Sequence, residues 1–381
     1  MNSKVIYFYI IAAVSLCFSC GGRSTSVGEQ GDTLFLQHAE LLRMVRCDDY
    51  VKVEVDNPWH PGKKLHTYYL VPASIADDIR QQLATQGTVV TVPLQRTVAF
   101  STVHGNLVAD MLGCESQLVG MADVEFVHAP RLKQLCQQGR VQHVGSSLSP
   151  NIEQLLTLHP DAILLSPFDN NGGYGKVGEL GIPLIECADY MEETPIARAE
   201  WIKFYGLLFG EEQRADSLFH VVDSCYQKLV SLAAEAASFP TVLMDKMTGS
   251  VWYVPGGRST MGTMLNDAHI RYVFADDTHS GSVALPFERV LAQAADASLW
   301  FLRYASHPEQ GYALQTLRSE HPGYSQFAAL RQGCCYGCDT RTSLFFDETP
   351  FRPDWLLRDF VTIAHPELQL GAPKYFLPIP G

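Results

Sequence analysis

The spacing of apolar and polar residues divides the chain into segments with different predicted structures. Tyr50 to Val55 and Leu65 to Val71 are short runs rich in valine and tyrosine, separated by the turn cluster Asn57 to Gly62. This pattern predicts a hairpin of two strands, and Thr88 to Val92 predicts a third strand. We therefore expect residues 32–92 to form a small β extension that packs on the first lobe of the protein.

From Arg96 onward, short apolar runs alternate with segments in which apolar residues recur at helical spacing. Strands and helices that alternate in this way are typical of a mostly parallel sheet with helices on both faces. The pattern therefore predicts an α/β fold. The predicted strands are 97–100, 118–121, 162–166, 183–186, 241–245, 251–254, 272–275 and 297–302. The predicted helices are 103–112, 129–136, 174–180, 261–267 and 354–364.

A long helical segment interrupts this alternation. Thr194 and Pro195 are typical of a helix start, and after Gly210 a second helix is expected over residues 211–237. At 1.5 Å per residue this helix would be about 40 Å long, which suits a strut between two lobes. Its apolar residues fall on one stripe: Ala215, Leu218, Phe219, Val222, Tyr226, Leu229 and Ala233. We therefore expect two Rossmann-like lobes, at 93–190 and 239–381, joined by interlobe helices at 191–238.

The N-terminus has the pattern of an export signal. Lys4 precedes an apolar run from Val5 to Phe18, which is too short to cross a bilayer comfortably. Residues 16–20 resemble a lipoprotein-processing box, in which Cys20 becomes the acylated N-terminus, and a plain secretory signal is the alternative. We expect a signal peptide at 1–20, a tether at 21–31, and contact with the membrane through the lipid anchor only.

Composition and cysteine spacing limit the partners and ligands. The net charge of −13 argues against a nucleic-acid partner, which would require a basic footprint, and we expect a monomer. Cys334, Cys335 and Cys338 include a C-x-x-C pair. That pair could be half of a zinc site, a local disulfide or free thiols, but no second close pair completes four zinc ligands. We therefore assign no metal site.

Motifs of known enzymes are weak or missing in the sequence. Gly173 to Gly178 match G-x-G-x-x-G, but Pro167 to Gly172 separate them from the preceding strand, whereas dinucleotide binding needs a tight strand-turn-helix. The sequence has no nucleophile elbow, Walker loop or zinc-protease helix, and its 13 histidines are scattered. We expect neither a catalytic residue nor a cofactor.

One short pattern occurs twice, once in each predicted lobe. Glu153 precedes Asp161 by the same interval as Glu288 precedes Asp296, and each copy predicts a helix, a turn and a buried strand. Repeated units of this kind indicate two lobes of one design. A carboxylate in the first turn of a helix gains about 0.3–1 kcal/mol from the helix dipole alone. The pair could also form two matched acidic contacts for a two-fold partner.

From about Arg96 to Leu368 the chain resembles the periplasmic binding proteins for ferric siderophores, haem and cobalamin. The resemblance is carried by the Asn151-Ile152-Glu153 and His159-Pro160-Asp161 segments, the Glu288 copy, the long helix and residues 252–257. It implies that Glu153 and Glu288 dock an ABC permease dimer, and that the ligand is a ferric siderophore, haem or a corrinoid.

Ligands of open α/β sheets bind at the carboxyl ends of the strands, so a cleft is expected between loops of the two lobes. Large flat ligands need aromatic walls and a few polar groups, and arginines can bind ligand carboxylates in bidentate fashion. The predicted ligand-binding residues are His104, Phe168, Trp252, Tyr253, Arg258, Arg303 and Tyr304. Further candidates in the same loops are Ser101, Thr102, Val103, Phe126, Asp169, Asn170, Ser259 and Arg341.

These observations predict the lipid-anchored, periplasmic substrate-binding protein of an ABC importer. Two alternatives stay open. The first is an anchored module that sequesters its ligand without a permease of its own, which a neighbouring transporter operon would distinguish. The second is a chelatase-like enzyme acting on a tetrapyrrole, against which the export signal argues.

Overall fold

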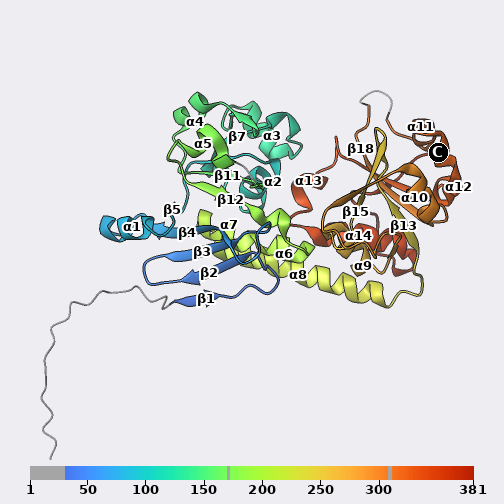
Figure 1. Cartoon of the computed structure of the whole chain (residues 1–381), viewed down its shortest axis with the longest axis horizontal. Coiled ribbons are helices and arrows are strands. Elements are labelled where there is room, and N and C mark those ends of the chain that lie inside the picture. The colour runs from blue at the N-terminus through green and yellow to red at the C-terminus, as the bar shows by residue number, and fades with distance from the viewer. Residues whose placement is uncertain (1–30, 170–171, 308–310) are drawn as a thin grey trace, which may run out of the picture.

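The computed structural model describes residues 31–169, 172–307 and 311–381. Two α/β lobes lie side by side and are joined along one edge by helices, with a separate sheet beside the first lobe (Figure 1). The predicted fold class is therefore confirmed. The predicted signal peptide, the tether before residue 31 and the acylated Cys20 lie outside the described residues.

The first lobe contains a five-stranded parallel sheet in the order β12-β11-β6-β7-β8. The chain builds β6, β7 and β8 outward on one side, then returns to place β11 and β12 on the other side of β6. The strands are β6 (Thr97–Ala99), β7 (Leu118–Met121), β8 (Gln142–His143), β11 (Ala162–Leu165) and β12 (Leu184–Glu186). Its helices are α2 (Thr102–Asn106), α3 (Pro130–Gln137), α4 (Ile152–Leu158) and α5 (Gly175–Gly178). A π-helical turn, Leu107–Met111, continues α2.

The second lobe has a sheet in the order β16-β13-β18-β19-β20, in which only β20 is antiparallel. Its strands are β13 (Thr241–Met244), β16 (Arg271–Tyr272), β18 (Leu299–Tyr304), β19 (Cys335–Asp339) and β20 (Leu377–Pro378). A separate antiparallel sheet contains β14 (Met247–Thr248), β15 (Val251–Pro255) and β17 (Ser282–Leu285). The helices are α9 (Thr260–Asp267), α10 (Phe287–Ala294), α11 (Leu314–Glu320), α12 (Ala328–Gln332), α13 (Phe345–Glu348) and α14 (Pro353–Ala364).

Three helices connect the lobes: α6 (Pro195–Glu200), α7 (Ile202–Phe209) and α8 (Glu212–Ala234). The Thr194 side chain caps α6 by accepting from the N–H of Ala197, and Gly210 ends α7 in the left-handed conformation. Helix α8 has 23 residues, about 35 Å at 1.5 Å per residue, and runs under both lobes (Figure 1). Its predicted apolar stripe is buried, apart from the half-buried Leu218.

The segment before the first lobe is larger than the predicted hairpin. Strands β3 (Val51–Asp56) and β4 (Lys64–Pro72) pair antiparallel as expected, and β5 (Thr88–Val92) pairs parallel to β4. Two strands and a helix were missed: β1 (Asp32–Leu34), β2 (Leu42–Arg46) and α1 (Asp77–Ala84), which crosses from β4 to β5. Residues 32–92 thus form a five-stranded sheet with its own crossover helix.

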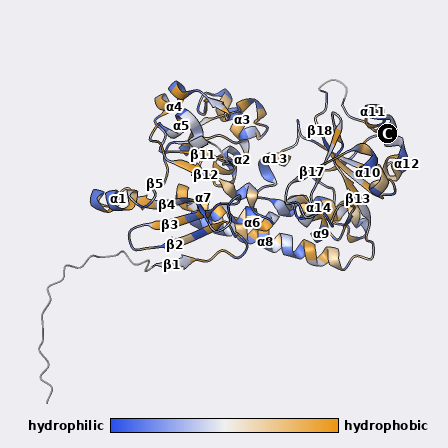
Figure 2. Cartoon of the chain, viewed as in Figure 1, coloured by the Kyte–Doolittle hydropathy of each residue, from blue (hydrophilic) through white to orange (hydrophobic). Residues whose placement is uncertain are grey.

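One hydrophobic core runs through the extension, both lobes and the interlobe helices, and the sheet strands carry much of the apolar sequence (Figure 2). In the second lobe the core centres on Trp252 and Trp300, whose rings stack with centroids 5.7 Å apart. Trp252 is fully buried and donates from Nε1 to the carbonyl oxygen of Met244. Its neighbour Tyr253 points the other way from β15 and is 49% exposed, because side chains of a strand alternate between its faces.

The contrast between these neighbours predicts different costs of truncation. Trp252→Ala should lower the free energy of unfolding by about 3–5 kcal/mol, because it leaves a large cavity in a close-packed core. Tyr253→Ala should change it by about 0.5 kcal/mol or less, since its ring is largely solvated. Urea unfolding of the two variants checks this, and equal losses would contradict the assignment of Trp252 to the core.

Candidate ligand-binding cleft and docking residues

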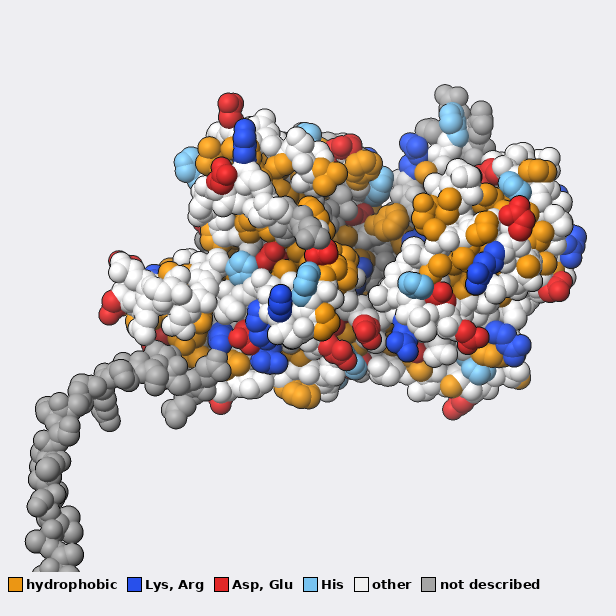
Figure 3. Space-filling view, viewed as in Figure 1, with side chains coloured by type: hydrophobic (Ala, Val, Ile, Leu, Met, Phe, Trp, Pro, Cys, Tyr) orange, Lys and Arg blue, Asp and Glu red, His pale blue; other side chains and the backbone are white. Residues whose placement is uncertain are grey.

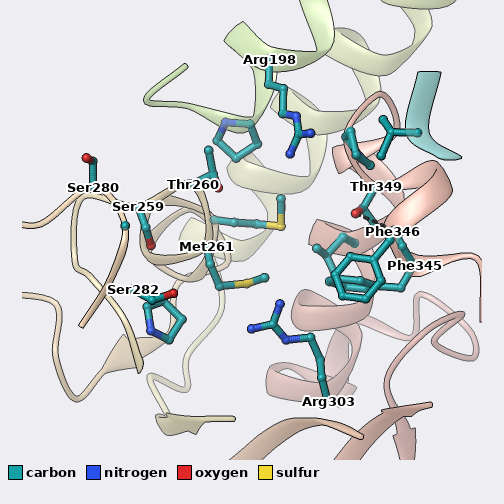
Figure 4. Close-up of a pocket in the computed structure, with 17 residues that line it drawn as sticks. Arg198, Ser259, Thr260, Met261, Ser280, Ser282, Arg303, Phe345, Phe346 and Thr349 are labelled. Atoms are coloured by element: carbon teal, nitrogen blue, oxygen red, sulfur yellow. Dashed lines mark hydrogen bonds between the residues drawn. The ribbon is translucent and has the colours of Figure 1, made fainter. Parts of the chain in front are cut away.

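A cavity of about 310 Å³ lies between the two lobes and is lined by residues of both lobes and of the interlobe segment. Figure 3 shows the corresponding hollow between the lobes. The lining side chains are apolar or hydroxyl-bearing, apart from two arginines (Figure 4). They come from α2, α6, the end of β15, α9 with the loop before it, the β17 segment, β18, α13 with the residues after it, and α14: Val103, Pro195, Arg198, Pro255, Ser259, Thr260, Met261, Met264, Ser280, Gly281, Ser282, Arg303, Phe345, Phe346, Thr349, Pro350 and Leu356.

Arg198 reaches the cavity from α6 and is held by a buried carboxylate. Its Nε donates to Asp189, over 3.0 Å, and no described residue accepts from its two terminal nitrogens. Asp189 is fully buried and also accepts from His104 Nε2 and the Tyr205 hydroxyl, each over 3.0 Å. Burial alone would raise the pKa of Asp189, but the His104 hydrogen bond and the Arg198 charge lower it. The carboxylate therefore stays charged and orients the guanidinium toward the cleft.

Arg303 reaches the same cavity from β18 and is held in a similar way. Its Nε and Nη2 donate to the two carboxylate oxygens of Asp245, over 2.8 and 2.5 Å. Asp245 directly follows β13, the strand beside β18, so this ion pair sits at the carboxyl end of the sheet. The guanidinium also lies 5.9 Å from the centre of the Phe345 ring. In Figure 4 both arginines point into the space between Met261 and the phenylalanines.

Apolar and helix-end groups complete the walls. Phe346 is 50% exposed on α13, and α13 packs against α2 of the first lobe, where Asn106 donates to the carbonyl oxygen of Asp347. The opposite wall is the start of α9, where Ser259 caps the helix by accepting from the N–H of Gly262. Because the N-terminus of a helix carries partial positive charge, this wall also favours an anionic group.

Only one of the seven predicted ligand-binding residues, Arg303, lines this cavity. His104 and Trp252 are corrections: they are 2% and 0% exposed. His104 lies behind the cavity wall and contacts Asp189, whereas Trp252 belongs to the core of the second lobe. Both point inward because their neighbours, Val103 and Tyr253, occupy the outward side of the same element.

The other four residues lie elsewhere on the surface. Tyr253 and Arg258 are exposed on the second lobe outside the cavity wall, and Tyr304 stacks on Tyr312 with centroids 4.0 Å apart. Phe168 is 51% exposed and lines a second, mainly apolar hollow of about 590 Å³ in the first lobe. That hollow lies at the carboxyl ends of β6 and β11, where the strand order reverses, and its other residues include Phe100, Leu148, Ile152, Leu165 and Tyr174.

The sequence-based prediction missed Arg198, Phe345 and Phe346. Arg198 was placed inside the predicted interlobe helices, and nothing in the local pattern shows which face of a short helix meets the cleft. The phenylalanines follow β19, a strand that the sequence did not predict because it contains Gly337 and Asp339, residue types that are depleted in strands. A strand ending at Asp339 would have placed residues 345–346 at the ligand-binding edge.

The C-x-x-C pair has a structural explanation. Cys335 and Cys338 are buried free thiols on β19, and residues three apart on a strand face opposite sides of the sheet. They therefore form neither a local disulfide nor one face of a metal site. Among the described residues, no three His, Cys, Asp or Glu side chains come together as a metal site. None of the described helices is long and apolar enough to cross a membrane.

The repeated segments occupy equivalent places in the two lobes. Helices α4 and α10 each lead into the strand beside the first strand of the lobe, β11 beside β6 and β18 beside β13. Glu153 and Glu288 are exposed in the first turns of these helices. The aspartates differ: Asp161 accepts from the N–H groups of residues 95 and 96, whereas in the second lobe Ser298 bonds Thr241 in that place.

A family model described as periplasmic binding protein matches residues 75–342, most of the chain and both lobes. The chain belongs to the periplasmic binding protein family. Proteins of this family bind solutes rather than catalyse reactions. An uncharacterized lipoprotein of Methanocaldococcus jannaschii is 23% identical over 92% of this chain and 86% of its own length.

Two solved structures illustrate the shared fold. A periplasmic heme binding protein from Pseudomonas aeruginosa aligns with a TM-score of 0.56 and 20% identity, over 72% of this chain and 93% of the other. An Fe3+-Desferal bound siderophore binding protein from Vibrio cholerae aligns with a TM-score of 0.54 and 15% identity, over 71% and 99%. These two structures cover 72% and 71% of this periplasmic binding protein, so the part that does not align is longer than the predicted signal peptide and tether together.

The buried His104 predicts a pH dependence of stability. Burial alone would lower the pKa of His104, but the Cys187 side chain and the hydrogen-bonded Asp189 raise it from 6.5 to about 10. Because the pKa of His104 is higher in the folded chain, protonation of His104 stabilises the folded chain. This contribution to the free energy of unfolding is full below about pH 6.5 and is lost as the pH rises toward 10. Urea unfolding of the wild type and His104→Gln between these pH values should show a stability difference that shrinks with rising pH. A constant or growing difference would contradict a charged His104.

Proposed function

We propose that this periplasmic binding protein captures an anionic iron complex or corrinoid and delivers it to an ABC permease. The observation that carries the proposal is the pair Arg198 and Arg303, each held by a carboxylate and each facing one cavity between the lobes. Each guanidinium keeps a free terminal N–H for a ligand, because Asp189 takes only Nε of Arg198 and Asp245 takes Nε and Nη2 of Arg303. The site thus binds an anion without having to reorient its cations.

The cavity chemistry favours a ligand with carboxylates on an apolar body. Phe345, Phe346, Met261 and Met264 supply apolar contact area, and the two arginines supply fixed charge-assisted donors. Haem, with two propionates, and ferric siderophores with free carboxylates fit this description better than an uncharged corrinoid. Cobalamin is therefore less favoured as the ligand than haem or a ferric siderophore.

Glu153 and Glu288 are the proposed contacts with the permease. Both side chains are exposed at the start of equivalent helices, and neither makes an ion pair within the described chain. Two carboxylates displayed by two similar lobes suit a partner made of two similar subunits. The name of the M. jannaschii relative supports lipid anchoring, so we propose that Cys20 tethers the protein outside the cytoplasm.

The sequestering module and the chelatase remain as alternatives. A module without a permease would not need the acidic pair, so loss of uptake on changing that pair separates it from an importer. A chelatase would need a base that can take up the protons of a tetrapyrrole. The described cavity residues include no His, Asp, Glu or Cys, which favours solute binding.

The ligand assignment predicts a loss of affinity at both arginines. Arg198→Ala and Arg303→Ala should each raise the Kd for a carboxylate ligand roughly 10- to 100-fold, because a hydrogen bond to a charged group contributes about 1.5–3 kcal/mol. Fluorescence titration with haemin, cyanocobalamin and a carboxylate siderophore measures this. Arg258→Ala, an exposed arginine outside the cavity, is the matched control and should bind as the wild type does. Unchanged affinity in both cleft variants would contradict the assignment.

The docking assignment predicts a separation of binding from transport. Glu153→Ala combined with Glu288→Ala should abolish ligand uptake by cells while the Kd of the purified protein stays unchanged, since neither residue touches the cavity. Glu179→Ala, exposed on the first lobe, serves as the control. Normal uptake by the double variant, or its loss together with affinity, would contradict the role in docking.

A further inference from the structure

The loop between β1 and β2 of the extension is bound by two buried carboxylates. Five successive backbone N–H groups, those of residues 37–41, all donate to Glu192 or Glu200. Glu200 accepts the first three over 2.7–3.0 Å, and Glu192 accepts the other two over 3.1 Å. Glu192 is 4% exposed and Glu200 is 0% exposed. Such contacts are strong because ionised acceptors strengthen a hydrogen bond and burial excludes competing water.

Both carboxylates are also tied to the interlobe helices. Glu192 accepts from the indole N–H of Trp201 over 2.8 Å, and Glu200 pairs with Lys203 over 2.7 Å. The loop is further held by His38, whose Nε2 lies 3.5 Å from Asp223 of α8. The extension is thus joined to the interlobe helices by polar contacts. Breaking them costs free energy, because removing one partner leaves a buried donor or charge without a hydrogen bond.

The segment that contains Glu192 and Glu200 also contains Arg198, one of the two cleft arginines. Asp189 and Arg198 lie within the segment 189–200 that Glu192 and Glu200 fix to the extension. Helix α6 has only six residues, and a helix this short is not stable by itself in water. Its order, and therefore the direction of Arg198, depends on tertiary contacts.

The extension is itself attached to the first lobe and to the interlobe helices. Its β4 is bonded to the first lobe through Tyr68, whose hydroxyl donates to the carbonyl oxygen of Leu184 and accepts from the N–H of Glu186. Arg46 of β2 pairs with Glu212 at the start of α8. Its buried strands also belong to the main core. A loop held by a sheet that shares the main core can fix α6 in place.

We propose that the N-terminal extension braces the ligand site, with Glu192 and Glu200 as positioning residues for Arg198. The inference rests on the proposed function in taking Arg198 as a ligand contact. Neither glutamate lines the cavity, so each acts on a ligand through α6 alone. Arg303 belongs to the second lobe and is held by Asp245, and the brace does not reach it. The proposal therefore assigns the extension an effect on one of the two cleft arginines.

The test compares Glu200→Gln with Glu193→Gln in the soluble chain. Glutamine keeps the size of Glu200 but turns an NH₂ group toward backbone N–H donors, whereas Glu193 is exposed on the same segment and serves as the control. Hydrogen–deuterium exchange should accelerate at least about tenfold in residues 37–41 and 196–201 of Glu200→Gln, since a lost bond to a charged group costs more than a factor of ten. Exchange in β18, which carries Arg303, should not change.

A second measurement links the brace to ligand binding. With haemin as the probe, Glu200→Gln should raise the Kd about fivefold or more, and should add less than about twofold to the effect of Arg198→Ala, because residues acting through one contact are not additive. Full additivity would mean a general loss of structure rather than positioning, and would overturn the proposal. If Glu200→Gln does not fold, Glu192→Gln is tested with the same expectations.

The outcomes separate the brace from the ligand assignment. Exchange is measured on the free protein, so failure of the wild type to bind haemin would contradict only the proposed ligand class. Faster exchange confined to residues 37–41, with 196–201 unchanged, would show that the glutamates hold the extension but not α6. That result, or unchanged exchange in both segments, would overturn the brace.

Discussion

Three buried carboxylates on one short segment organise the centre of this molecule. Asp189 joins the first lobe to the interlobe helices through His104 and Tyr205, and Glu192 and Glu200 join those helices to the extension. A buried charge is unfavourable unless it is paired and fully hydrogen bonded, so each carboxylate enforces the placement of several partners at once. The position of Arg198 in the cleft is one consequence of this constraint.

The cleft uses the same principle on both sides. Each side of the cleft presents one arginine that donates to an aspartate at the carboxyl end of a strand or just beyond it, which leaves at least one terminal nitrogen of each arginine for a ligand. Two positively charged guanidinium groups can therefore face one cavity, because each is paired with its own aspartate. The phenylalanines of α13, which packs on α2, give the space an apolar wall that spans the junction between the lobes.

The two lobes share a plan but not the details of their packing. The repeated helix-turn-strand units place Glu153 and Glu288 alike, yet Asp161 has no counterpart contact at Asp296, because Ser298 and Thr241 join the strands there. The second lobe adds a small antiparallel sheet and an aromatic core around Trp252 and Trp300. Glu153 and Glu288 can keep equivalent positions although the packing around them differs. An exposed carboxylate at the start of a helix is stabilised by the helix dipole and by water, not by the core.

Hydrophobic periodicity by itself determined the α/β class, the buried stripe of α8 and the β3 and β4 hairpin. The repeated interval from glutamate to aspartate determined the two acidic positions. Each of these features depends on residues close together in sequence. The β2 strand could also have been predicted, since apolar Leu42 and Met44 alternate with charged Arg43. Arg303 could be named because it directly follows the predicted strand 297–302.

Only the tertiary structure decided which side chains meet in the cleft. His104 and Trp252 have the right type and the right neighbourhood for ligand contacts, but their elements turn them inward, while Arg198 is brought to the cavity by a buried aspartate nine residues away. The five N–H contacts of residues 37–41 with Glu192 and Glu200 join parts of the chain more than 150 residues apart. No local pattern encodes such contacts, because their energy exists only when the chain is folded and the charges are removed from water.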